Sequence, residues 1–332
     1  MATQQQFRDF LTDIEPSNTT KERASRAHTG PRDFLAAHEK FRNYHVKTFL
    51  SGSHVRDTAI RRRVADTEED RADIDVIVVT RHTKADEPED VISRLYTTLK
   101  EKYSGAKKNV RSVTIRTNDF KVDIVPIIAP NGMEGTLYIP DRDLGDWVET
   151  NPPRHTQWTV DTNRKADGRF KPLVKLVKWW RRENPTGFRK PKGFVLECIA
   201  AECMDYNQSV WQELFVTTFE QMVARYSGYI QLAVVPTIAD PAGTGIPITK
   251  GMTFDEFKDF YEMVQRHAQI GRGAIEEEDS EKETGMWRKI FGPRFPACAS
   301  RTIESLLTAA PPISLTFPNK PVNPANKPRG FA

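Results

Sequence analysis

The sequence has few cysteines and no long apolar segment, and both shortages restrict the classes of protein to which it can belong. Its 332 residues include three cysteines, Cys198, Cys203 and Cys298, with no CxxC spacing. An odd number without that spacing argues against a disulfide framework or a cysteine zinc site and favours the reducing cytoplasm. No run approaches the roughly 18 apolar residues of a membrane span. Residues 1–16 contain three acidic side chains and no apolar segment, so we expect no secretory signal.

An excess of charge of one sign is also lacking. Lysine and arginine number 49 against 45 aspartates and glutamates, which gives a net charge of +4. The basic residues form no concentrated stripe, and the seven histidines have no metal-ligand spacing. We therefore expect no duplex DNA partner, no membrane partner and no zinc site built from histidine and cysteine.

Apolar periodicity divides the chain into a strand-containing part and a helical part. Residues 19–44 are helix-rich, with a break expected at Gly30-Pro31. Strand character dominates before residue 130, with a hairpin expected at Asn118-Asp119, and helical periodicity dominates from residue 170 onward. The expected strands are residues 46–50, 74–80, 110–116 and 120–128, and the expected helices are residues 91–103, 173–180, 194–204, 211–226 and 254–270.

These patterns predict an α/β (α+β) chain with two domains and a tail. Residues 1–168 would form the mixed α/β domain with an N-terminal helix, and residues 169–310 a helical domain that closes a cleft. Residues 311–332 would form a flexible tail. Six prolines and no acidic residue between residues 309 and 332 support the tail, because such a segment buries too little apolar surface to become ordered.

Three acidic residues lie in or beside apolar strands, where charged side chains are rare. Asp73 and Asp75 alternate at the start of one expected strand, so period 2 places both carboxylates on the same face. Asp123 lies inside a second strand. Buried charges require a partner, and three converging carboxylates can hold two Mg²⁺ ions that activate a hydroxyl and stabilise leaving pyrophosphate. The alternative is surface acids at strand ends that form caps or salt bridges.

A glycine and a hydroxyl residue, Gly52 and Ser53, follow the strand expected at residues 46–50. If a helix starts near residues 55–60, its free backbone N–H groups would face a polyphosphate. Gly52 would let the backbone approach the phosphates closely, and Ser53 would donate a hydrogen bond. An ordinary turn is the alternative interpretation of this pair alone.

The order Gly-Ser, Asp-Ile-Asp and Val-Asp-Ile-Val-Pro resembles the motifs of the polymerase-β-type nucleotidyltransferase superfamily. Within it, residues 19–296 are similar to the bacterial CD-NTases, relatives of animal cyclic GMP–AMP synthase. The segments that carry the resemblance are LSGSHVRDTAI (50–60), DIDVIVV (73–79), VDIVPII (122–128), TNPPRH (150–155), LVKLVKWWR (173–181), PKGFVLE (191–197), IADP (238–241) and MWRKIFGPRFP (286–296).

This resemblance implies both a fold and an activity. The fold would be a polymerase-β-like nucleotidyltransferase domain with a mixed sheet and an N-terminal spine helix, followed by a C-terminal helical domain. The enzyme would use two Mg²⁺ ions, with Mn²⁺ as a substitute, to join NTPs into a cyclic di- or trinucleotide. Such second messengers activate downstream effectors of antiphage defence in CBASS systems.

The family's functional residues can be carried over by position. Asp73 and Asp75 would bind both metals, and Asp123 would complete the site and take the proton of the attacking sugar hydroxyl. Gly52 and Ser53 would hold the triphosphate of the nucleotide.

Two further positions match residues of the family that bind nucleotide. Thr58 matches a threonine that recurs in the loop after the Gly-Ser pair, and Lys178 matches a helix lysine that reaches the phosphates. A lysine on an apolar helix can also simply extend its ammonium group to solvent.

Two departures from the family pattern concern the nucleotide site. The link between the Gly-Ser pair and the first acid, residues 54–72, is longer than in many members, so it is either a lid or a solvated loop. Relatives often carry Lys-Ser-Phe where this chain has Lys192-Gly193-Phe194, so a phosphate-contacting serine is absent.

The resemblance also suggests partners besides the NTP substrates. Type II CBASS systems contain an E1/E2-like ligase that conjugates the synthase through its C-terminus, and the chain ends in a flexible segment with Ala332 last. Ala332 is therefore the expected conjugation point, and a tail with no role is the alternative.

Other function classes remain as alternatives at this stage. A nucleotidyltransferase that acts on RNA ends would share the metal site but should have a basic RNA track. A transferase for small molecules is usually shorter, and a non-catalytic scaffold would bind a nucleotide or a partner only.

Overall fold

The structure is a computed structural model that describes residues 4–62, 72–188 and 190–297, and Met1–Ala297 form one compact unit. The expected tail, the expected conjugation point Ala332 and residues 63–71 of the link at residues 54–72 lie outside the described residues. The predicted domain division at residue 168 stays a prediction. None of the described helices is both long enough and apolar enough to cross a membrane.

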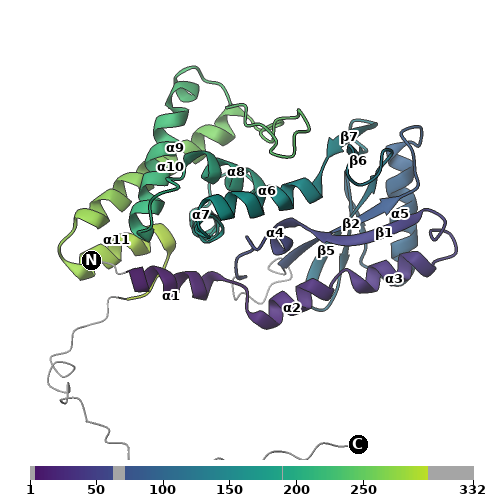
Figure 1. The fold of residues 1–332 in the computed structure, drawn as a ribbon, viewed down its shortest axis with the longest axis horizontal. Coiled ribbons are helices and arrows are strands. Elements are labelled where there is room, and N and C mark those ends of the chain that lie inside the picture. Colours follow the sequence, from purple (N-terminus) through teal and green to yellow (C-terminus); the bar gives the residue numbers. More distant parts are fainter. Residues whose placement is uncertain (1–3, 63–71, 189, 298–332) are drawn as a thin grey trace, which may run out of the picture. The chain divides into compact units, whose positions relative to one another are not determined.

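The described residues form helices at both ends of the chain and strands between them (Figure 1). The strands are β1 (His45–Ser51), β2 (Ala72–Thr80), β3 (Lys107–Lys108), β4 (Val113–Arg116), β5 (Phe120–Ile128), β6 (Leu137–Asp141) and β7 (Asp146–Thr150). The helices are α1 (Gln4–Ile14), α2 (Asn18–Arg26), α3 (Thr29–Ala37), α4 (Gly52–Val55), α5 (Pro88–Lys102), α6 (Pro152–Lys165), α7 (Phe170–Glu183), α8 (Gly193–Cys203), α9 (Trp211–Gln231), α10 (Phe254–Glu276) and α11 (Ser280–Phe291).

The strands build one mixed sheet in the order β1-β2-β5-β4-β3, with β6 paired to β5 and β7 paired to β6. The central strands β2 and β5 are parallel, and the other pairs are antiparallel. This mixed α/β architecture confirms the predicted fold class. The expected hairpin at Asn118-Asp119 is also confirmed, because β4 and β5 pair on either side of it.

Each face of the sheet has its own apolar cover. On one face, alternate β-branched residues such as Ile74 and Val122 pack against Leu35 of α3 and Leu95 of α5. On the other face, Ile77 and Ile127 meet residues of the β6 region. The acidic residues expected in the site share this second face, at the end that the apolar cluster leaves uncovered.

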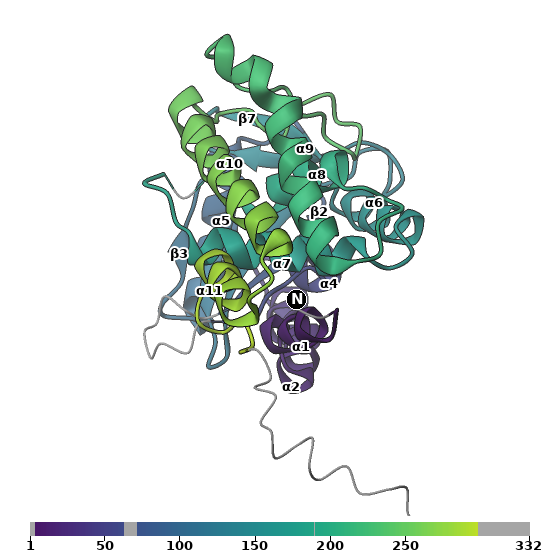
Figure 2. The same cartoon turned by 90° about the vertical axis from the view of Figure 1, so that its left-hand side faces the viewer.

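A second core joins the helices α7–α11 (Figure 2), where α9 and α10 lie side by side. Helix α1 belongs to this core although it is first in the chain, because Phe7 packs edge-on against Trp287 and Phe10 against Trp179. Trp179 and Trp180 are buried here, as expected for core residues.

Several expectations about individual elements are wrong. The break between α2 and α3 falls at residues 27–28, and Pro31 lies in the first turn of α3, where a helix loses nothing by its missing N–H. The helix expected near residues 55–60 is absent, because α4 is a single turn over Gly52–Val55. No residue range was predicted for helices α1, α6 and α11 or for the hairpin β6–β7, although an N-terminal helix was expected.

Candidate active site

Gly52 lies at the point where β1 ends beside the acidic end of β2. Ser51 is paired with Asp75 across the two strands, and Gly52 has a φ of +77°. A Cβ on Gly52 would lie 1.9 Å from Oδ2 of Asp75, so no larger residue fits. The glycine therefore brings the backbone of the Gly-Ser pair into direct contact with an acidic side chain.

The parallel pairing of β2 and β5 brings the three predicted acids together. Asp75 is aligned with Asp123, and Asp73 is aligned with Lys121. Nζ of Lys121 lies 3.2 Å from Oδ1 of Asp73 and 3.9 Å from Oδ2 of Asp123. Lys121, which the sequence analysis did not identify, is thus a cation placed between two of the carboxylates.

Asp75 lies between Gly52 and Asp123, and these surroundings shift its pKa. Burial raises the pKa of Asp75, and the negative charges of Asp123 and Asp73 raise it further, although Arg56 and Lys121 oppose them. The carboxylates therefore repel one another, and an additional cation would relieve that repulsion.

The chemistry of this donor set suits a divalent metal. Carboxylate oxygens are the ligands that Mg²⁺ prefers, and mutual repulsion among the acids favours a cation between them. Within the described ranges, no group of three or more His, Cys, Asp or Glu side chains is already arranged as a complete metal site. Asp73, Asp75 and Asp123 fit Mg²⁺ by ligand type, with Lys121 as the counter-charge in the structure.

Thr58 and Lys178 lie together in a buried cluster centred on Glu197. The Glu197 carboxylate accepts hydrogen bonds from Nζ of Lys178 at 2.7 Å, from Oγ1 of Thr58 at 3.0 Å and from Nη2 of Arg56 at 2.9 Å. Burial alone would raise the pKa of Glu197, but Lys178 and Arg56 lower it. Burial lowers the pKa of Lys178, against the effect of Glu197. Two cations thus share one carboxylate, and the roles of Thr58 and Lys178 as nucleotide ligands stay predictions.

Two of the cluster's members, Arg56 and Glu197, were missed by the sequence analysis. They lie 141 residues apart in the chain, so no local spacing connects them. An acid inside the apolar segment of residues 194–200 was the one available signal, because a charge in such a position needs a partner.

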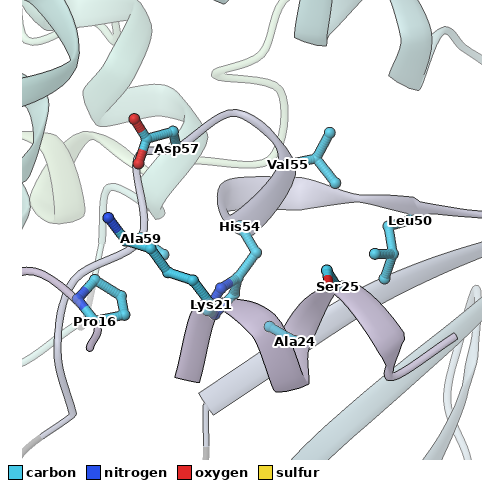
Figure 3. A pocket seen from close by; sticks show the side chains of 9 residues that line it. All are labelled: Pro16, Lys21, Ala24, Ser25, Leu50, His54, Val55, Asp57 and Ala59. Carbon is cyan, nitrogen blue, oxygen red and sulfur yellow. The ribbon is translucent and has the colours of Figure 1, made fainter. Parts of the chain in front are cut away.

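His54 faces a pocket of about 400 Å³ between α2 and the segment that follows β1 (Figure 3). Its side chain points from α4 toward α2, where Lys21 and Ser25 also line the pocket. Burial, with a smaller effect of Lys178, lowers the pKa of His54. Asp73, Asp75 and Asp123 are not among the residues that line this pocket.

A larger cleft of about 750 Å³ separates the far edge of the sheet from the helical part. Asn109 and Asp141 line it on the sheet side, and Lys192, Asp240 and Lys250 line it on the other side. Gly193 follows at the start of α8, where a Cβ would lie 3.5 Å from Cε of Lys178. The Lys192-Gly193 departure therefore lies where the cleft meets the Glu197 cluster.

Comparisons with known proteins identify the family of this chain. Residues 1–163 match the family described as Second Messenger Oligonucleotide or Dinucleotide Synthetase domain. The chain is 45% identical over 340 residues to a cyclic AMP-AMP-AMP synthase of Acinetobacter sp., with 100% of this chain and 98% of the relative covered. It is 26% identical over 357 residues to a cyclic AMP-AMP-GMP synthase of Enterobacter hormaechei, with 89% and 92% covered.

Solved structures share the fold at low sequence identity. CdnC of E. coli with ATP has a TM-score of 0.68 and 18% identity, with 89% of this chain and 99% of that chain covered. CdnG of Bradyrhizobium diazoefficiens with GTP has a TM-score of 0.73 and 14% identity, with 87% and 95% covered. Together with the full-length relative at 45% identity, these likenesses establish that the chain belongs to the CD-NTase family, the nucleotidyltransferases that synthesise cyclic oligonucleotides.

Proposed function

We propose that this chain is a Mg²⁺-dependent synthase that joins ATP molecules into a cyclic trinucleotide. The observation that carries the proposal is the alignment of Asp75 with Asp123 directly beside Gly52, which groups acidic ligands and a closely approaching backbone at one end of the sheet. The choice of ATP and of three nucleotides rests on the relative that is 45% identical, a cyclic AMP-AMP-AMP synthase.

In the proposed reaction the chain's residues bind and orient two nucleotides. Asp73, Asp75 and Asp123 would hold the Mg²⁺ ions, which supply charge stabilisation for the attacking oxygen and the leaving pyrophosphate. Gly52 and Ser53 would bind the triphosphate of the donor. Gly52 supports this role because its lack of a side chain lets the backbone of the Gly-Ser pair lie directly against the Asp75 carboxylate.

Asp123 would accept the proton of the acceptor's ribose hydroxyl. The hydroxyl oxygen forms a bond to the α-phosphorus of the donor, and the bond from that phosphorus to the pyrophosphate oxygen breaks. Pyrophosphate leaves with the electron pair of the broken bond. Repetition of this step lengthens the linear oligonucleotide. In the last step the free ribose hydroxyl of the oligonucleotide attacks the α-phosphorus of its own triphosphate, pyrophosphate leaves, and the ring closes.

The Glu197 cluster supports a site for a polyphosphate. Arg56 and Lys178 are two cations that share the single carboxylate of Glu197, and both act electrostatically on Asp75 or its neighbours. The surplus positive charge would favour a triphosphate near the acidic end of the sheet. Lys178 and Thr58 would thus contribute to nucleotide binding near the Gly-Ser segment.

Membership of the family suggests a biological role. We propose that the cyclic product activates an effector of antiphage defence, and that an E1/E2-like ligase acts on Ala332. A solved neighbour at 18% identity is the complex of E. coli CdnC with a HORMA protein. That partner is a property of CdnC.

One experiment tests the activity. The purified chain is incubated with each labelled NTP and Mg²⁺, treated with phosphatase and analysed by chromatography. We expect a phosphatase-resistant trinucleotide from ATP alone, its loss with EDTA, and its loss in Asp73→Asn/Asp75→Asn. The control is Asp119→Asn, an exposed acid paired with Arg23, which should retain activity.

Other outcomes would contradict the proposal in distinct ways. Label transferred to added RNA would indicate an enzyme that acts on RNA ends. Cyclic product in the Asp73→Asn/Asp75→Asn variant would show that the metal site is assigned to the wrong residues.

A further inference from the structure

A buried hydroxyl lies against the acid that the proposed function uses as the base. Thr114 on β4 is aligned with Asp123 on β5 and has only 5% of its surface exposed. Its Oγ1 donates a hydrogen bond to Oδ1 of Asp123. Threonine side chains are stiff at χ1, so the position of this hydroxyl is set by the strand.

A second residue determines which way the hydroxyl proton points. Nδ2 of Asn109 donates to Oγ1 of Thr114 at 2.7 Å and to Oγ of Ser112 at 3.0 Å. An amide N–H can only donate, and an ionised carboxylate can only accept. Because Oγ1 accepts from Asn109, the single hydroxyl proton of Thr114 is directed to Asp123.

Asn109 is itself held in place by its backbone. Its N–H donates to the carbonyl oxygen of Ser112 at 2.9 Å, and its carbonyl oxygen accepts from Nη1 of Arg142 at 3.1 Å. Asn109 also lines the 750 Å³ cleft. A fixed chain of donors therefore runs from the cleft wall through Thr114 to Asp123.

We propose that Asn109 and Thr114 are positioning residues that fix the Asp123 carboxylate for the nucleotidyl transfer. They engage Oδ1 and leave Oδ2 on the side of Lys121, whose Nζ lies 3.9 Å away. Oδ2 is then the oxygen available to the metal and to the proton of the attacking hydroxyl. This inference rests on the proposed function, because it assigns a task to the neighbours of its base.

The first test compares two substitutions of one hydroxyl. Thr114→Val removes the hydroxyl but keeps the shape, and Thr114→Ser keeps the hydroxyl. We expect Thr114→Val to lower kcat about 10–100-fold, the usual effect of losing a hydrogen bond that orients a ligating carboxylate, with KM for ATP nearly unchanged. Thr114→Ser should restore most of kcat.

A second readout needs no turnover. Binding of Mn²⁺ to the nucleotide-free protein, measured by electron paramagnetic resonance, should weaken about 10-fold or more in Thr114→Val and much less in Thr114→Ser. Equal kcat and equal Mn²⁺ affinity in the two variants would overturn the inference. A lower melting temperature of Thr114→Val with an unchanged kcat per folded molecule would show that Thr114 acts only in packing, which would also overturn the inference.

A double-mutant cycle tests the chain of donors. Asn109→Ala should lower kcat in the wild-type background and have little further effect in Thr114→Val, because Asn109 acts through Thr114. An equal effect of Asn109→Ala in both backgrounds would overturn the link between the two residues. Asn109 lies outside the strands, so Asn109→Ala also provides the measurement if Thr114→Val does not fold.

Failure of this inference can be distinguished from failure of the proposed function. If wild type forms no cyclic product, or if Asp123→Asn keeps full activity, the proposed function or its base is wrong. If Asp123→Asn is inactive while Thr114→Val equals wild type, only the role of Thr114 and Asn109 is wrong.

Discussion

At the scale of single residues, close contacts and grouped carboxylates at the acidic end of β2 lower the stability of the fold but suit the binding of a metal ion. Gly52 leaves no space between the backbone and Asp75, since a Cβ there would lie 1.9 Å from Oδ2. Burial and two neighbouring carboxylates raise the pKa of Asp75. An ionised Asp75 is therefore less favourable in the folded chain than in the unfolded chain, as is common for groups kept for function.

This imbalance predicts that Asp75→Asn stabilises the metal-free protein while it removes activity. The neutral, isosteric amide avoids the repulsion by Asp123 and Asp73, so the free energy of unfolding at pH 7 should rise by about 1 kcal/mol. Because the folded-state pKa is raised, the gain should shrink as the pH falls from 7 toward the ordinary value for aspartate, where both states become protonated.

Urea unfolding of wild type and Asp75→Asn at several pH values measures this difference. Asp119→Asn is the matched control, because Asp119 is exposed and paired with Arg23, and it should give no gain. A variant Asp75→Asn that is less stable than wild type at pH 7 would contradict the argument.

At the scale of elements, the packing of α9 against α10 depends on one glycine. A Cβ on Gly271 would lie 2.6 Å from Cγ2 of Val216, whereas a Cβ on Gly273, two residues along the same helix, would meet only Sδ of Met286 at 3.9 Å. A side chain is therefore excluded at position 271 of α10 but can be accommodated at position 273. Only Gly271 is required for the close approach of the helices.

Substitution of each glycine by alanine should give opposite results. Gly271→Ala should lower the free energy of unfolding by about 1–3 kcal/mol, because the added methyl group overpacks the interface. Gly273→Ala should raise it by about 0.5–1 kcal/mol, because alanine is the better helix former. Chemical denaturation compares them, and Gly271→Ala/Val216→Ala should recover part of the loss. Equal effects of the two single substitutions would refute the assigned contact.

The sequence predicted those elements whose apolar pattern is strong. The β-branched strand at residues 74–80 and the hairpin at Asn118-Asp119 were found for this reason. Helix α6 was missed because its residues are mostly polar and it buries few of them. Helix α1 carried a usable signal, since its four buried apolar residues follow helical spacing, but it is short and begins three residues from the chain start.

Within the candidate site, the sequence could identify residues that are unusual in their local context. Acids in apolar strands and a glycine at a strand end stand out one by one. Thr114 does not, and Glu197 stands out only as an acid in an apolar segment, with nothing local to show its partners. Their contacts arise from pairing across strands or helices, and Thr58 reaches Glu197 across 139 positions. Such contacts depend on tertiary packing and leave no spacing in the sequence.

At the scale of the whole compact unit, the Glu197 cluster connects the sheet to the helices. Arg56 and Thr58 follow the Gly-Ser segment, Lys178 comes from α7, and Glu197 comes from α8. The unit has one apolar core on the sheet and another among the helices, with α1 in the latter. The buried charges of the cluster are therefore a polar connection between the two cores.

Removal of the central carboxylate should weaken the whole unit. In Glu197→Gln, Arg56 and Lys178 would remain buried without a counter-charge, so the free energy of unfolding should fall by about 3–5 kcal/mol. Glu202→Gln on the same helix is the control, because the pair of Glu202 with Arg225 is exposed and should contribute less than about 1 kcal/mol.

A compensating substitution separates charge from shape. Lys178→Met in the Glu197→Gln background removes one of the two uncompensated cations and should restore part of the stability. This double variant should also bind nucleotide more weakly, because it lacks the proposed phosphate ligand Lys178. Urea unfolding followed by tryptophan fluorescence and by circular dichroism measures both the stability and whether the two cores unfold together. If Glu197→Gln and Glu202→Gln were equally mild, the cluster would not hold the sheet and the helices together.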